Sequence, residues 1–237
     1  ACIGGKTGIN VPYGKNLIGC FYPPKKIVID ISALKSLPQK EFSNGIVEMI
    51  KHALIADVSL FEKMEHIRNH MFLDGFYNSE ILAELIAQSC RIKRDIVEED
   101  EKETGKRRLL NFGHTVGHPL ELLSQYSMSH GEAVAIGLLV ESYLSVDLGM
   151  LDLETFNRIR QILLQYGLPL QIPSKYSIDS LIDAMTLDKK SLKGCPRFVM
   201  IDGISSPLAF EGNYCTCVNE SHLIKALQWM NHDLCCH

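Results

Sequence analysis

The segment Arg107-Arg108-Leu109-Leu110-Asn111-Phe112-Gly113-His114-Thr115-Val116-Gly117-His118 carries most of the information in this chain. Its two histidines are four residues apart, so on a helix they lie on one face, one turn apart. Further along, His130 opens another apolar segment, and upstream Glu48 and Lys51 share a third predicted helix. A carboxylate and two imidazoles from separate helices can form a catalytic metal site, which has three protein ligands and an open position. The pattern therefore predicts a metalloenzyme.

Four other segments accompany this one along the chain. They are Gly4-Gly5-Lys6-Thr7-Gly8-Ile9-Asn10, Gly14-Lys15-Asn16-Leu17-Ile18-Gly19, Glu48-x-x-Lys51 and His130-Gly131-Glu132-Ala133-Val134-Ala135-Ile136-Gly137. In order and separation the five segments resemble 3-dehydroquinate synthase, and the resemblance extends from residue 1 to about residue 217.

The resemblance implies an activity in the shikimate pathway. That family converts 3-deoxy-arabino-heptulosonate 7-phosphate into 3-dehydroquinate and phosphate through transient oxidation by NAD, phosphate elimination, reduction and aldol closure. The resemblance also implies a cytoplasmic homodimer and makes Glu48, His114 and His130 the ligands of Zn²⁺, with Co²⁺ as an alternative. His118 is expected to transfer protons, although it could also be a fourth ligand or a packing residue.

The phosphorylated sugar acid carries two anionic groups, so the pocket needs cations. By resemblance the further catalytic residues are Lys51, Lys93, Arg107 and Asn111, and the substrate-binding residues are Lys6, Lys15, Asn16, Lys189 and Lys190. Arg107 suits bidentate anion binding. Between the adjacent lysines the sequence does not decide, and we favour Lys190. Pro119 departs from the family pattern, and a proline is tolerated there only if the helix begins within a turn of it.

Composition limits the class of protein. The 237 residues are 46% hydrophobic and 22% charged, as in an ordinary globular protein, and the net charge of −4 argues against nucleic acid as a partner. The longest apolar run, from Ala133 to Val140, is too short to span a membrane. The single, scattered cysteines Cys2, Cys20, Cys90 and Cys195 favour reduced thiols over a disulfide framework.

Periodicity predicts a mainly α fold. The resemblance implies that this fold is the multi-helix C-terminal domain of the dehydroquinate synthase-like fold, with a small β-hairpin and an N-terminal α/β remnant. Residues 1–22 are expected to be a glycine-rich loop and residues 26–31 a buried strand. Helices are expected from a cap at Ser43 or Asn44, around residues 81–92, and over 114–126, 130–148, 153–166, 177–187 and 220–230, with short strands at 197–201 and 214–218.

The resemblance implies two domains. Residues 1–38 are expected to be the end of an NAD-binding α/β domain, and residues 39–237 a helical domain that binds metal and substrate. No strand precedes Gly4-Gly5, so these glycines cannot be the phosphate turn of a dinucleotide fold, and the NAD site would lie mostly outside this chain. The chain is then either a fragment or one of two partner chains.

Three alternatives stay open. One is another sugar phosphate cyclase, which would share the metal site and differ in a few pocket residues. A second is a metal-dependent polyol or alcohol dehydrogenase, which would need fewer phosphate-facing cations. The third is a helical binding or assembly module without catalysis.

Overall fold

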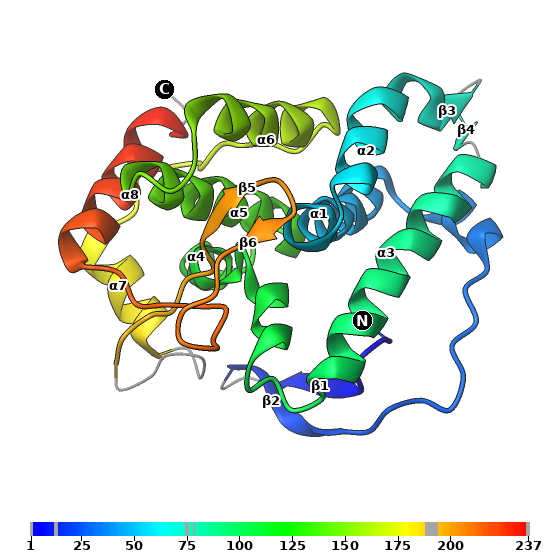
Figure 1. Ribbon diagram of the computed structural model, residues 1–237, viewed down its shortest axis with the longest axis horizontal. Helices are drawn as coiled ribbons and strands as arrows, with labels where there is room; N and C mark the ends of the chain where they lie inside the picture. Colours follow the sequence, from blue (N-terminus) through cyan, green and yellow to red (C-terminus); the bar gives the residue numbers. More distant parts are fainter. Residues whose placement is uncertain (1, 12–13, 74–75, 78, 188–193, 236–237) are drawn as a thin grey trace.

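Helices form most of the molecule, as the computed structural model in Figure 1 shows. It describes residues 2–11, 14–73, 76–77, 79–187 and 194–235, without the side chains of residues 10–17, 68–78 and 187. The α-helices are α1 (Gln39–Ala56), α2 (Val58–Met71), α3 (Ser79–Glu99), α4 (His114–Leu123), α5 (His130–Asp147), α6 (Leu153–Gln165), α7 (Ile178–Leu187) and α8 (Glu220–Asp233). The mainly α fold predicted from the sequence is confirmed. Among the described residues, no helix is long and apolar enough to cross a membrane.

Helix α5 lies at the centre of the helical body and packs against α1, α4, α6 and α8 (Figure 1). Almost every residue from Gly131 to Ser145 is buried, as expected of a helix that is apolar on all sides. Its start is fixed by a capping box, in which Ser129 and Glu132 each accept a hydrogen bond from the other's backbone amide. His130 is therefore held at the first position of a rigid, buried helix.

Glycines let α4 and α5 approach closely. A Cβ atom on Gly137 would lie 1.9 Å from the backbone oxygen of Gly113, and one on Gly117 would lie 3.1 Å from the backbone oxygen of Ala133. Gly113 itself has a φ of +79°, which a residue with a side chain rarely adopts. This contact between backbones places the first residue of α4 beside α5.

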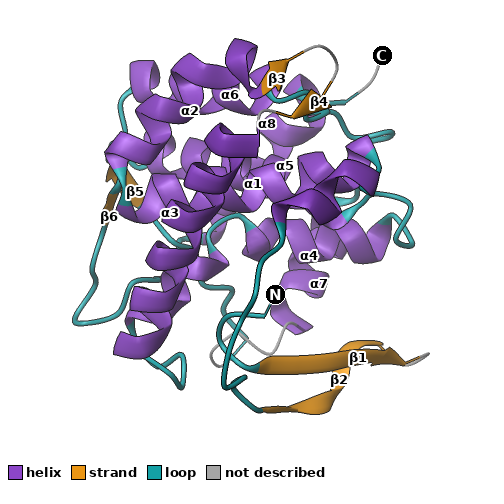
Figure 2. Cartoon of the chain, turned by 90° about the vertical axis from the view of Figure 1, so that its right-hand side faces the viewer, coloured by secondary structure: helices purple, strands orange, loops and turns teal. Residues whose placement is uncertain are grey.

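The N-terminal residues form a β-hairpin of strands β1 (Lys6–Val11) and β2 (Gly14–Phe21), which pair antiparallel with Lys6 opposite Phe21. Figure 2 shows this hairpin projecting from one end of the helical body. The predicted glycine-rich loop is therefore wrong, because the glycines lie within paired strands: Gly8 faces Gly19, and a Cβ on Gly19 would lie 1.6 Å from the oxygen of Thr7.

The buried strand predicted at residues 26–31 is also wrong. Val28 is 79% exposed, and residues 26–30 have no regular secondary structure before the chain enters the 3-10 helix η1 (Ile31–Ser36). A strand needs a neighbour for its backbone hydrogen bonds, and no other strand in the described part of the chain lies against this segment.

Several boundaries differ from the prediction. Helix α1 begins at Gln39 after Pro38, so Ser43 and Asn44 lie inside it and do not cap it. Helix α2 was not predicted, and neither were the short strand pairs β3 (Phe72–Leu73) with β4 (Phe76–Tyr77) and β5 (Ile201–Gly203) with β6 (Ser206–Pro207). The strands predicted at 197–201 and 214–218 meet only in one bridge, between Phe198 and Thr216.

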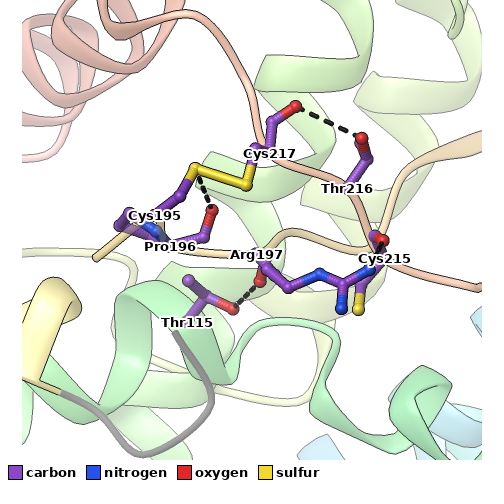
Figure 3. Close-up of a disulfide and its surroundings, with 7 residues drawn as sticks. All are labelled: Thr115, Cys195, Pro196, Arg197, Cys215, Thr216 and Cys217. Carbon is purple, nitrogen blue, oxygen red and sulfur yellow. Dashed lines mark hydrogen bonds between the residues drawn. A yellow bond between two sulfur atoms is a disulfide. The ribbon is translucent and has the colours of Figure 1, made fainter. Parts of the chain in front are cut away.

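That bridge explains a disulfide that the sequence did not predict. The structure joins Cys195 to Cys217, because pairing of Phe198 with Thr216 brings the two segments side by side (Figure 3). The expectation of a reduced thiol is thus wrong for Cys195, whereas Cys2, Cys20 and Cys90 are free.

The same segment is fixed against α4. The Thr115 hydroxyl donates to the Arg197 carbonyl over 2.7 Å, and the Arg197 guanidinium donates to the Cys215 carbonyl over 2.7 Å (Figure 3). The start of α4 is therefore held both by α5 and by the C-terminal part of the chain.

Candidate metal centre

Three helices bring Glu48, His114 and His130 together. Glu48 lies in the middle of α1, whereas His114 and His130 are the first residues of α4 and α5. Glu48 Oε1 is 3.6 Å from His114 Nε2 and 3.7 Å from His130 Nε2. Ligands about 2.1 Å from a tetrahedral Zn²⁺ lie about 3.4 Å from one another. The three atoms are therefore spaced as the ligands of one divalent ion would be, and the predicted grouping is present.

The carboxylate of Glu48 is held so that one oxygen faces the histidines. Lys51 Nζ donates to the other oxygen, Oε2, over 2.7 Å and to the Leu110 carbonyl over 2.8 Å. Oε1 is buried and makes no hydrogen bond to the described residues. A buried acceptor without a hydrogen bond is costly, and a bound cation would satisfy it. The donor set thus fits a metal ion.

The two imidazoles are oriented by their other ring nitrogens. His114 Nδ1 lies 3.1 Å from the Phe112 carbonyl, to which it can donate, so Nε2 keeps its lone pair towards Glu48. His130 Nδ1 lies 3.4 Å from Glu121 Oε1. Glu121 is not among the predicted site residues, although its spacing of three residues from His118 places it on the same face of α4.

The charges around the site shift several pKa values. Burial raises the pKa of Glu48, but Lys51 and the neighbouring histidines lower it more, to well below the usual 4.5. Glu121 and then Glu48 raise the pKa of His130 to about 9. His52 lies one turn after Glu48 in α1, and its Nδ1 is 2.7 Å from the Ser89 hydroxyl. Burial and then Lys51 lower the pKa of His52 to about 3, so its ring is neutral.

His118 lies one turn after His114 on α4, and the ring centroids are 5.2 Å apart. Its ligand atom groups with those of Glu121 and His130, and not with Glu48. Pro119, the departure from the family pattern, is buried inside α4, five residues after the helix begins. The helix therefore begins slightly more than one turn before Pro119, further away than the sequence prediction required. Because proline has no backbone N–H, the helix lacks one hydrogen bond at this position.

A cavity of about 310 Å³ opens beside the Glu48 carboxylate, between α1, α3 and the segment around η1. Glu48 and Lys93 both line it. Burial and then Lys51 lower the pKa of Lys93. Two of the predicted cations, Lys51 and Lys93, thus lie next to Glu48.

Three other predicted residues contact protein groups instead of an open pocket. Arg107 is buried and donates to the Gly4 carbonyl over 2.8 Å and to the Glu101 carbonyl over 2.6 Å. Lys6 pairs with Glu103, whose other oxygen accepts a hydrogen bond from Asn111 over 2.7 Å. Glu103 is not among the predicted site residues, and its position in the sequence gives no signal for this contact.

The remaining predicted substrate residues fall outside the description. Lys189 and Lys190 belong to the undescribed residues 188–193. Lys15 and Asn16 lie in β2, but their side chains are not described.

Comparison with known families matches both parts of the chain. Residues 45–191 match the family described as "3-dehydroquinate synthase C-terminal", and residues 1–44 match "3-dehydroquinate synthase N-terminal". The chain is 44% identical to a 3-dehydroquinate synthase of Nostoc punctiforme over 84% of this chain and 55% of that relative. It is 46% identical to one of Legionella pneumophila (strain Paris) over 85% of this chain and 54% of that relative. The chain thus spans about half the length of the curated relatives it matches.

Solved structures share the fold. A 2-deoxy-scyllo-inosose synthase, complexed with carbaglucose-6-phosphate, NAD⁺ and Co²⁺, superposes with a TM-score of 0.81 at 24% identity, over 94% of this chain and 61% of that one. The 2-epi-5-epi-valiolone synthase of Streptomyces hygroscopicus subsp. jinggangensis, with NAD⁺ and Zn²⁺ bound, also superposes with a TM-score of 0.81 at 24% identity. This superposition covers 98% of this chain and 62% of that one.

Proposed function

Because the chain belongs to the 3-dehydroquinate synthase family, we propose that it is the metal- and substrate-binding part of a 3-dehydroquinate synthase. The reaction, a phosphorus–oxygen lyase step of the shikimate pathway, would convert 3-deoxy-arabino-heptulosonate 7-phosphate into 3-dehydroquinate and phosphate. One observation carries the proposal: Glu48 Oε1, buried without a hydrogen bond, faces the Nε2 atoms of His114 and His130. Relatives of this name at 42–46% identity favour this reaction over those of other sugar phosphate cyclases.

The proposal divides the chain at Gln39, where the helical body begins. Residues 1–38 would be the end of an NAD-binding α/β domain, supported by the match of residues 1–44 to the N-terminal family. The rest of that domain would be supplied by further chain or by a partner chain, since the match covers only 55% of the Nostoc relative. The working form would be a cytoplasmic homodimer, by resemblance to the family.

Glu48, His114 and His130 would hold Zn²⁺ or Co²⁺, and the solved structures with these metals and NAD⁺ support this choice. When bound, the metal supplies positive charge next to the substrate hydroxyls, and NAD supplies the hydride acceptor. One carboxylate and two neutral imidazoles leave that charge incompletely neutralised. Lys51 fixes Glu48 Oε2, so the carboxylate presents only Oε1 to the metal.

The chain's own residues would bind and orient the substrate. Lys51 and Lys93 bring positive charge beside the cavity, where a phosphate or carboxylate can meet it. His118 lies next to both metal-binding histidines and would exchange a proton with a substrate oxygen. Lys6, Lys15, Asn16, Arg107, Asn111, Lys189 and Lys190 would complete the pocket. Lys6 and Asn111 now contact the carboxylate of Glu103, so an anionic group of the substrate would have to replace that carboxylate as their partner.

The test is release of phosphate from the heptulosonate phosphate in the presence of NAD and Zn²⁺. We compare the 237-residue chain alone with the same chain joined to the N-terminal portion of the Nostoc relative. The chain alone should release none, because loss of the positioned NAD removes about 7–11 kcal/mol of orientation effect. The joined protein should be active. Lys93→Met should reduce this activity, whereas Lys25→Met, at an exposed position, should not.

Two results would contradict the proposal. Phosphate release by the chain alone would overturn the domain division. A joined protein that is folded and holds metal but releases no phosphate would overturn the assignment as a 3-dehydroquinate synthase.

A further inference from the structure

The carboxylate of Glu121 lies behind the proposed metal centre. Its side chain is 3% exposed, and Oε1 is 3.4 Å from Nδ1 of His130. The opposite nitrogen of the same ring, Nε2, faces Glu48 Oε1. Glu48, His130 and Glu121 are thus arranged in a row, with the imidazole between the two carboxylates.

We propose that Glu121 is a positioning residue for the metal centre, which holds the ring of His130 so that Nε2 faces the metal. The inference rests on the proposed metal site at Glu48, His114 and His130. A metal-binding histidine that donates its other N–H to a carboxylate is fixed in one tautomer and one orientation, and becomes a better ligand. Glu121 would accept this hydrogen bond from Nδ1–H of His130.

Both partners of this contact are fixed by the ends of their helices. The backbone carbonyl of Glu121 accepts hydrogen bonds from Tyr126 N over 2.8 Å and from Ser124 Oγ over 2.9 Å, at the end of α4. His130 lies inside the capping box of α5, in which the Glu132 carboxylate accepts a hydrogen bond from Ser129 N over 2.7 Å. Because both backbones are held, the distance between the carboxylate and the ring is set by the fold.

An alternative arrangement uses Glu121 itself as a ligand. The ligand atoms of His118, Glu121 and His130 lie within 4.8 Å of one another, as do those of Glu48, His114 and His130. His130 contributes to both groups through opposite ring nitrogens. The buried Oε1 of Glu48, which makes no hydrogen bond in the described chain, favours the metal on the Glu48 side. Glu121 then serves as the acceptor behind the ring.

The experiment measures Co²⁺ affinity by competition with a chelator, together with the visible absorption of the bound Co²⁺. It uses the whole chain and the variants Glu121→Ala, Glu121→Gln, Glu48→Gln and Glu132→Gln. We expect Glu121→Ala to weaken binding by about 10- to 100-fold and to change the absorption spectrum. Glu121→Gln keeps an oxygen acceptor and should restore part of the affinity. Glu132→Gln is the matched control, since glutamine also serves in a capping box, and should bind as the wild type does.

Several outcomes would overturn the inference. The inference is wrong if Glu121→Ala binds Co²⁺ within about twofold of the wild-type affinity and with an unchanged absorption spectrum. If this variant does not fold, the same criterion applies to Glu121→Gln. Loss of binding in Glu121→Ala with normal binding in Glu48→Gln would place the metal on the other side of His130. If the wild-type chain binds no Co²⁺, the proposed metal site itself is refuted. The titration of the wild type thus separates failure of the metal site from failure of the role of Glu121.

Discussion

Substitution of Gly137 by alanine tests whether backbone contact between α4 and α5 builds the metal site. The added Cβ would lie 1.9 Å from the Gly113 oxygen, 2.8 Å from the Gly113 carbonyl carbon and 3.0 Å from the Gly117 nitrogen. All three are backbone atoms, so no flexible side chain can move aside, and the helices themselves must move apart. Overpacking of this kind costs about 1–3 kcal/mol, and we expect the upper end. Higher helix propensity of alanine offsets about 1 kcal/mol, which leaves a net loss of about 2 kcal/mol in the free energy of unfolding.

The matched control is Gly45→Ala in α1, where a Cβ would meet nothing within 4 Å. There the alanine should stabilise the protein by about 0.5–1 kcal/mol. Urea denaturation of the metal-free proteins measures both effects, and a Co²⁺ titration measures the consequence for the site. We expect Gly137→Ala to bind metal more weakly as well, because Gly113 directly precedes His114. Equal stability of the two variants would refute the argument that this close contact sets the geometry.

Two further changes test other parts of the account. The carboxylate of Asp147 contacts His222 and Lys225. Burial raises its pKa, but the two partners lower the pKa by more, so that it lies below the usual 3.8. The ionised carboxylate therefore stabilises the fold fully above its unfolded-state pKa, and this stabilisation is lost as the pH falls through its folded-state pKa. Urea denaturation should show that Asp147→Asn is less stable than the wild type at about pH 7. The stability difference between the two proteins should shrink below about pH 4. Arg107→Lys should remove at least one of the hydrogen bonds to Gly4 and Glu101, and hydrogen exchange should then accelerate in the hairpin β1–β2, whereas Arg94→Lys, whose guanidinium contacts an exposed aspartate, should leave it unchanged.

The helical part of the fold was predictable because its apolar positions repeat with helical spacing. Helices α4 to α8 begin and end within a few residues of the prediction, and α3 continues past the predicted end to Glu99. The N-terminal part was not predictable in this way. Residues 26–31 have the composition of a buried strand, but a strand depends on a partner that local sequence does not reveal, and Val28 is exposed. The hairpin of residues 6–21 was missed because glycines at paired positions resemble those of a loop.

The metal-site grouping was predictable because each of its residues lies in a recognisable segment. Glu121 could have been found from its spacing to His118, whereas the contact of Glu103 with Lys6 and Asn111 depends on the folding of a turn. The roles of Arg107, Lys6 and Asn111 in binding substrate stay predictions, since their side chains contact protein groups here. The disulfide depended on a single backbone bridge between distant segments, which the spacing of the cysteines does not encode.

Elemental analysis measures whether Glu48, His114 and His130 bind one divalent metal ion, as we propose. After exposure to Zn²⁺ and removal of excess metal, the wild-type chain should retain about one Zn²⁺ per chain, as expected of a site with three ligands. The double variant Glu48→Gln, His130→Ala should retain none and should stay folded, because the core consists of buried apolar side chains and includes neither substituted residue. Retention of stoichiometric zinc by the folded double variant would contradict the claim.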